Sequence, residues 1–218
     1  MVLEVRAVAP FHKNGFLLGC DRTHEAVIID PGDEWPELLP LADHHRLDVR
    51  AILLTHAHLD HISGVAAAKE RFGAPVFLHR ADLFLYERAA QQGAMFGVHV
   101  PEPPPVDRFY DGSDISLGDG VVRVRHTPGH CPGEVCLQVS MPSETRQHLF
   151  VGDTLFAGSI GRTDLPGGDY GTLMHSITEV LFPLGDDAIV HPGHGPDTTI
   201  GQERATNPFV KQFLSESR

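Results

Sequence analysis

Cysteine is scarce in this sequence, which has only Cys20, Cys131 and Cys136 among its 218 residues. Three is an odd number, and a chain of this length does not need disulfides to stabilise its core, so a disulfide framework is not expected. The sequence also lacks an apolar run of the roughly 18 residues that span a membrane. Its first residues lack the basic and apolar regions of a signal peptide. We therefore expect a soluble, cytoplasmic protein with reduced thiols and no membrane partner.

Basic residues are few as well. Lys and Arg number 17 against 29 Asp and Glu, which gives a formal net charge of −12 at pH 7. Binding to nucleic acid needs clustered Lys and Arg to neutralise phosphates, so we expect no nucleic-acid partner. Histidine, in contrast, is abundant, with 15 residues. This excess of imidazole side chains indicates metal or proton chemistry.

Hydrophobic residues make up 41% of the chain, enough for a continuous core in one domain spanning residues 1–218. Strands are expected at residues 2–8, 15–20, 26–29, 49–54, 75–78, 121–125, 135–139, 149–151 and 188–191. Helices are expected at residues 34–45, 62–72, 81–91, 170–182 and 202–214, with Pro40 interrupting the first. The first three strands favour an antiparallel start. The later interleaving of strands and helices predicts a layered α/β or α+β architecture.

One segment concentrates metal-binding residue types at the end of a predicted strand. Thr55-His56-Ala57-His58-Leu59-Asp60-His61 follows the strand at 49–54. Residues two apart in an extended chain point to the same side, so His56 and His58 can bind one ion together. Asp60 and His61, at the start of the next helix, can turn toward a second ion. Asp60 alone could be a helix N-cap and the histidines polar loop residues, but four such residues in seven favour a metal site suited to zinc or iron.

Three further strand ends offer matching residues. His130 follows the strand at 121–125 in a Thr-Pro-Gly-His segment, Asp153 follows 149–151, and His194 follows 188–191 in a Pro-Gly-His-Gly segment. Each lies beside glycine, which lets the backbone approach closely and leaves the side chain in a cleft. Singly, each residue would more often be structural, for example a turn carboxylate in the case of Asp153. Together they complete a set of seven candidate ligands.

The Thr-His-Ala-His-Leu-Asp-His run, followed in order by His130, Asp153 and His194, resembles the metallo-β-lactamase superfamily over most of the chain. Two further segments, at residues 161–169 and 192–196, are similar to the short, single-domain glyoxalase-II-like hydrolases. This resemblance implies a four-layer αββα sandwich with two divalent metal ions at one edge. It assigns His56, His58 and His130 to the first ion, Asp60, His61 and His194 to the second, and Asp153 as a bridge. We expect zinc, with iron or manganese as alternatives.

The chain departs from full-length glyoxalase II enzymes in three places. Those enzymes have a C-terminal helical region that helps to bind glutathione, and we expect no such separate domain here. They carry a Lys and a Tyr where this sequence has Arg162 and Asp164. A Tyr two residues past the last metal-binding His is replaced by Pro196. A cationic side chain is retained but the aromatic hydroxyls are absent, so the identity of the thiol that carries the acyl group stays open.

The implied activity is hydrolysis of a small-molecule thioester, such as an S-2-hydroxyacyl glutathione, by a metal-bridging hydroxide. Asp153 and Asp60 are the catalytic candidates, Asp60 because it can orient the hydroxide. A thiolate leaves readily, which agrees with the absence of Gly-x-Ser-x-Gly or Ser-x-x-Lys nucleophile motifs. Arg162 can anchor a substrate carboxylate or form an ion pair with Asp164 or Asp169.

Several alternatives remain open at this point. Persulfide dioxygenases share the histidine run but use one iron at the positions of His56, His130 and Asp153, and they carry a Tyr shortly after the final His. Lactonase or β-lactamase activity uses related metal chemistry, although a bridging Asp153 argues against a lactamase. A non-catalytic metal-binding scaffold is disfavoured by the complete ligand set. Asp30 is expected to support a ligand histidine, and Cys131 to pack away from the metals. The acyl group, the native metal and the oligomeric state stay open.

Overall fold

The first half of the chain forms one six-stranded sheet. We describe residues 1–216 of a computed structural model. The strands lie in chain order, β1 pairs with β2 and β2 with β3 in antiparallel fashion, and the remaining neighbours are parallel. The antiparallel start is therefore confirmed. The strands are β1 (Val2–Val8), β2 (Lys13–Gly19), β3 (Glu25–Ile29), β4 (Asp48–Leu53), β5 (Val76–Leu78) and β6 (Arg108–Phe109).

The second half of the chain forms another six-stranded sheet, in the order β14-β13-β10-β9-β8-β7. Only β10 and β13 pair in parallel, and the other neighbours are antiparallel. A separate small hairpin joins β11 (Leu155–Phe156) to β12 (Ser159–Ile160). The sheet contains β7 (Ile115–Leu117), β8 (Gly120–His126), β9 (Val135–Ser140), β10 (His148–Gly152), β13 (Ile189–Pro192) and β14 (Thr198–Thr199).

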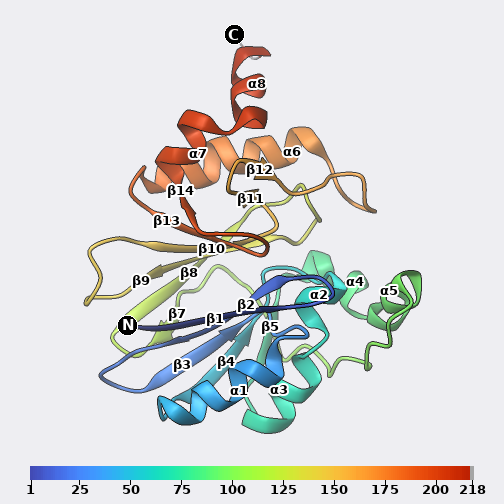
Figure 1. Cartoon of the computed structure of the whole chain (residues 1–218), viewed down its shortest axis with the longest axis vertical. Helices are drawn as coiled ribbons and strands as arrows, with labels where there is room; N and C mark the ends of the chain where they lie inside the picture. The colour runs from blue at the N-terminus through green and yellow to red at the C-terminus, as the bar shows by residue number, and fades with distance from the viewer. Residues whose placement is uncertain (217–218) are drawn as a thin grey trace.

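The two sheets face each other and helices cover their outer faces (Figure 1). The helices of the first half are α1 (Trp35–His44), α2 (Leu59–Ile62), α3 (Val65–Phe72), the 3₁₀ turn η1 (Arg80–Asp82), α4 (Leu83–Tyr86) and α5 (Ala89–Phe96). Those of the second half are α6 (Tyr170–His175), the π-helical η2 (Ser176–Leu181), the 3₁₀ turn η3 (Phe182–Leu184), α7 (Ile200–Thr206) and α8 (Pro208–Glu216). The predicted four-layer αββα sandwich is confirmed. No helix within residues 1–216 is long and apolar enough to cross a bilayer.

Strand periodicity builds this sandwich, because neighbouring side chains of a strand point to opposite faces of the sheet. On β2, Phe16 and Leu18 belong to the core between the sheets, whereas Leu17 belongs to the core under the helices of the first half. On β10, Phe150 faces the other sheet, while its neighbours Leu149 and Val151 pack under the helices of the second half. The rings of Phe16 and Phe150 meet edge to face, with centroids 4.9 Å apart. The two sheets are thus joined by a buried apolar layer.

Three predicted helices are interrupted by non-helical residues, and a fourth, expected at 170–182, runs without a break through α6 and the π-helical η2. The helix expected at 62–72 is two helices, α2 and α3, which flank Ser63 and Gly64. A side chain at Gly64 would collide with the Gly32 carbonyl, so the chain is pressed against its neighbour at this break. The helix expected at 81–91 is replaced by η1, α4 and α5, and the one at 202–214 is divided between Asn207 and Pro208. The predicted interruption at Pro40 is wrong, because α1 continues through it with Leu38 and Ala42 buried on either side.

We predict that Phe150→Ala lowers the free energy of unfolding by about 3–5 kcal/mol, since it leaves a cavity between the sheets. Phe96→Ala is the matched control, because Phe96 is 58% exposed and its loss should cost under about 1 kcal/mol. Urea unfolding followed by circular dichroism measures both values. Equal losses in the two variants would contradict the assignment of Phe150 to the inter-sheet core.

Candidate metal centre

The segment after β4 carries the first four candidate ligands. The chain leaves the sheet after Leu53 and passes through the loop 54–58, which contains His56 and His58. It then enters α2, whose first turn contains Asp60 and His61. The side chains of His56 and His61 are fully buried. The loop after β4 and the first turn of α2 therefore place four candidate ligands within six residues, 56–61, as the sequence predicts.

The other three candidate ligands come from the second sheet. His130 lies in the loop that follows β8, Asp153 directly follows β10, and His194 follows β13. His194 also forms an isolated backbone bridge with Lys13 of the first sheet. The centre thus lies where the C-terminal end of β4 in the first sheet meets the strand ends of the second sheet.

The donors form two groups. The ligand atoms of His56, His58 and His130 lie within 4.8 Å of one another, and the same holds for Asp60, His61 and His194. In the first group, His58 Nδ1 and His130 Nε2 are 2.8 Å apart. In the second, Asp60 Oδ2 lies 3.1 Å from His194 Nε2 and 3.7 Å from His61 Nε2.

Asp153 lies between the two groups. Its Oδ1 is 3.4 Å from His61 Nε2, and its Oδ2 is 3.7 Å from His130 Nε2 and 3.6 Å from His194 Nε2. One carboxylate therefore reaches donors of both groups. The structure brings all seven predicted side chains together, and their roles as ligands remain predictions.

Several candidate ligand atoms at this centre have no hydrogen-bond partner within residues 1–216. His56 Nε2, His61 Nε2 and Asp153 Oδ1 are buried without a hydrogen-bond partner among residues 1–216. Each such atom costs about 1–3 kcal/mol when it stays unsatisfied. A side chain at Gly193 would collide with Asp153 Oδ1 and lie 2.7 Å from His61 Cε1, so only glycine leaves this space open. The unsatisfied nitrogens and oxygens in this space fit divalent cations that accept imidazole and carboxylate ligands.

The remaining nitrogens of two candidate ligands are held by the protein. His61 Nδ1 lies 2.9 Å from Asp30 Oδ2, and Asp30 also accepts hydrogen bonds from the backbone N–H and hydroxyl of Thr55. His130 Nδ1 lies 2.8 Å from the Arg162 carbonyl oxygen. Such contacts fix the orientation of a metal-binding imidazole. Asp30, Thr55 and the Arg162 carbonyl therefore support the donors, as the sequence predicts for Asp30.

Glu134 is a supporting residue that the sequence did not reveal. It is fully buried, accepts a hydrogen bond from the Asp153 backbone N–H at 3.0 Å, and lies 3.4 Å from His56 Nδ1. Cys131 donates to Glu134 and, at 3.0 Å, to Asp82, which also accepts from the Ala57 N–H. Cys131 is buried, as predicted, and its thiol contacts these two carboxylates and not the seven candidate ligands. Its contacts with two carboxylates were not predicted, because nothing in the local sequence indicates them.

Burial and charge set the protonation states at the centre. Burial lowers the pKa of His56 well below its usual value and that of His58 to about 3, so both imidazoles are neutral at pH 7. Neutral imidazole is the form that binds metal ions. Burial disfavours the charged form of His61, but Asp60 and Asp153 raise its pKa well above the usual value. Burial of Asp153 is outweighed by His61, which lowers the pKa of that carboxylate.

Arg162 lies beside the centre but outside the donor set. Its guanidinium is exposed and binds the Asp164 carboxylate through two contacts of 2.7 and 2.8 Å. Of the two predicted ion-pair partners, Asp164 is therefore the one found. His191, three residues before His194, contacts His148 at 2.9 Å rather than the donors.

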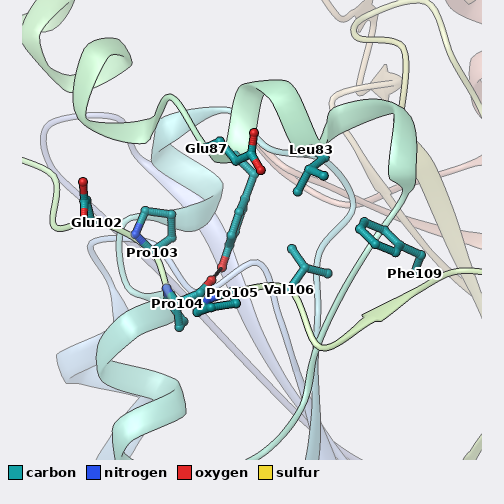
Figure 2. A pocket seen from close by; sticks show the side chains of 9 residues that line it. Leu83, Glu87, Glu102, Pro103, Pro104, Pro105, Val106 and Phe109 are labelled. Carbon is teal, nitrogen blue, oxygen red and sulfur yellow. Dashed lines mark hydrogen bonds between the residues drawn. The ribbon is translucent and has the colours of Figure 1, made fainter.

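A surface cavity of about 410 Å³ lies apart from the candidate ligands. Figure 2 shows it between Leu83 of α4, Glu87 directly after that helix, and the proline-rich segment 103–105. Tyr86 donates a hydrogen bond to the Pro104 carbonyl at 2.8 Å and so ties the segment to the helix. None of the residues that line this cavity belongs to the set of seven.

Two named relatives match nearly the whole chain. The hydroxyacylglutathione hydrolase GloC of Haemophilus influenzae is 38% identical and covers 96% of this chain and 98% of its own length. The "Probable metallo-hydrolase YqgX" of Bacillus subtilis is 35% identical, with 94% and 96% covered.

Solved structures agree with this similarity. The crystal structure of BLEG-1 B3 metallo-beta-lactamase has a TM-score of 0.87 and 39% identity, and covers 96% of this chain and 99% of its own. The structure of TTHA1623 in a di-iron-bound form has a TM-score of 0.81 and 42% identity, with 94% and 99% covered. The family model of the metallo-beta-lactamase superfamily matches residues 9–194. The chain therefore belongs to the metallo-beta-lactamase superfamily and is a metal-dependent hydrolase of that group.

Proposed function

We propose that the protein is a dinuclear metal-dependent thioesterase of the glyoxalase II type, which cleaves S-2-hydroxyacyl glutathione or a related thioester. The observation that carries this proposal is the position of Asp153 between two groups of three donors, with oxygens 3.4–3.7 Å from histidines of both. Similarity to the hydroxyacylglutathione hydrolase GloC over 96% of the chain supports the substrate class.

In this proposal His56, His58 and His130 hold one divalent cation, Asp60, His61 and His194 hold the second, and Asp153 contacts both. Two such cations, when bound, lower the pKa of a shared water and polarise a carbonyl oxygen. We propose zinc as the native metal, while the similar di-iron structure keeps iron as the main alternative.

The chain itself supplies orientation rather than a nucleophile. Burial of Asp60 is outweighed by His61 and His194, which lower the pKa of its carboxyl, so Asp60 stays ionised and can accept a hydrogen bond from the attacking water. Cys131 is not available for attack, because it is buried and its pKa is raised well above the usual value. A thiolate leaving group needs no proton at neutral pH, which agrees with a centre whose imidazoles are all committed as ligands.

A second candidate activity is β-lactam hydrolysis. The specific observation in its favour is the 39% identity to BLEG-1 B3 metallo-beta-lactamase over 96% of this chain. The same donor set would polarise a lactam carbonyl. We rank it second because a lactam nitrogen, unlike a thiolate, leaves only when it gains a proton.

We predict that Asp153→Ala lowers the bound metal to one equivalent or less and reduces kcat/KM for thioester hydrolysis by at least about 100-fold, since it removes the shared carboxylate. Asp111→Ala is the control, because Asp111 is an exposed carboxylate that accepts a hydrogen bond from the Ser113 N–H. Metal analysis after gel filtration and a thiol-release assay give both readouts. Retention of two metals and of full activity in Asp153→Ala would rule out the mechanism.

A substrate panel separates the candidate activities. We expect the purified protein to contain about two metals per chain, to release thiol from S-lactoylglutathione or another acyl thioester, and to lose this activity with a chelator and regain it with zinc or iron. Nitrocefin tests lactamase activity, and oxygen uptake with glutathione persulfide tests a dioxygenase. Rapid oxygen uptake with one iron per chain, or turnover of nitrocefin alone, would overturn the thioesterase proposal.

Arg162 is proposed to anchor a substrate carboxylate, since its guanidinium is exposed and its backbone carbonyl oxygen lies 2.8 Å from His130 Nδ1. We predict that Arg162→Ala raises KM for a carboxylate-bearing thioester by about 10-fold, roughly 1.4 kcal/mol, with little change in kcat. Arg50→Ala is the control, since Arg50 is an exposed arginine paired with Asp48 on β4. A neutral thioester of similar size should be unaffected by either change. An unchanged KM for the charged substrate would leave Arg162 as the partner of Asp164 only.

A further inference from the structure

Asn14, near the start of β2, contacts the loop that carries His194. Its side-chain Nδ2 donates to the Pro192 carbonyl at 3.0 Å and to the Gly195 carbonyl at 2.8 Å. Its backbone N–H donates to the Gly193 carbonyl at 2.7 Å. Both hydrogens of the amide are thus used, one on each side of His194.

The loop around His194 needs such support. His194 lies between two glycines, which restrict the backbone less than other residues do, and Gly195 has a φ of +80°. The His194 side chain is 31% exposed, whereas those of His56, His61 and His130 are almost completely buried. Packing therefore restrains His194 less than these three histidines. Within residues 1–216, no side chain besides Asn14 is found donating to the carbonyls of residues 192–195.

Asn14 is itself firmly placed. The preceding residue, Lys13, is buried, and its ammonium binds the Glu34 carboxylate at 2.7 Å and the Asp30 carbonyl oxygen. Asp30 in turn holds His61, the partner of His194 in the second group of donors. The start of β2 is thereby linked through Asp30 to His61, and it can position His194 of the same group.

We propose that Asn14 is a positioning residue that holds His194 in the second group of donors. This inference rests on the proposed two-metal function. Asn14 has no contact with His56, His58 or His130 among the hydrogen bonds of the described chain, so its loss should affect one group only. The expected consequence is a selective weakening of the second metal-binding step.

The test is stepwise Zn²⁺ binding to metal-free protein, measured by competition with a chromophoric chelator. For Asn14→Ala we expect the first Zn²⁺ affinity to stay within about threefold of the wild type and the second to fall by 10- to 100-fold, the usual effect of losing a supporting contact to a ligand. Asn14→Ser keeps one hydrogen-bond donor on a smaller side chain, so its second Zn²⁺ affinity should lie between those of the wild type and Asn14→Ala. Circular dichroism shows whether each variant is folded under the same conditions.

Asn207→Ala is the matched control. Asn207 is also a buried asparagine whose Nδ2 makes two hydrogen bonds, to the Ser159 carbonyl and to Glu203, both at 2.9 Å. It lies at the junction of α7 and α8, and its loss should lower stability while both Zn²⁺ affinities are retained.

The outcomes separate the two proposals. Unchanged affinities in folded Asn14→Ala and Asn14→Ser, or an equal fall of both binding steps, would overturn the role of Asn14. Selective loss of the second step supports it, even if the wild-type protein with two zinc ions fails to hydrolyse any thioester, in which case only the proposed function falls. A wild-type protein that binds a single Zn²⁺ would overturn both.

Discussion

The metal centre depends on holding two sheets at a fixed distance, because neither sheet carries a complete donor set. His56, His58, Asp60 and His61 come from the end of β4, and His130, Asp153 and His194 from the second sheet. The inter-sheet core, including the Phe16–Phe150 contact, sets the overall spacing. Polar links then set it locally: the Val135 N–H donates to the Thr55 carbonyl at 2.9 Å, and Asn14 binds the His194 loop. Core packing and donor geometry are therefore coupled.

Charge balance is the second constraint on this centre. Asp60 and Asp153 lie close together and are both ionised, which their attraction to His61 makes possible. Behind them, burial and then the charge of Asp153 raise the pKa of Glu134 well above its usual value, which favours its protonated form. A neutral Glu134 can support His56 and Asp153 without adding a third negative charge. The negative charge is thus concentrated on Asp60 and Asp153, the two carboxylates among the candidate ligands.

The sequence predicted those parts of the structure whose signal is local. Residues 55–61 place four donors in seven positions, and a glycine beside each of His130, Asp153 and His194 marked a strand end. Glu134 and Asn14 were missed because their roles arise from contacts between residues far apart in the sequence. Glu134 lies 78 positions from His56, and Asn14 lies 181 positions from Gly195. Strands of two or three residues, such as β6, β11 and β14, were missed since periodicity needs a longer segment. The helix breaks at Gly64 and Asn207 depend on tertiary contacts.

In the proposed function the two cations would polarise either carbonyl, so they would not decide between a thioester and a lactam. The choice depends on what the chain offers the leaving group. In the proposed function each histidine of the two groups is a metal ligand, Asp60 is held ionised, and the Cys131 thiol is buried against two carboxylates. Glu134, whose raised pKa favours the protonated form, is fully buried beside His56 and Asp153 and is therefore not a free acid. A thiolate departs without a proton, whereas an amide nitrogen must take one from solvent. The lack of a spare acid favours the substrate with the better leaving group, which is the thioester.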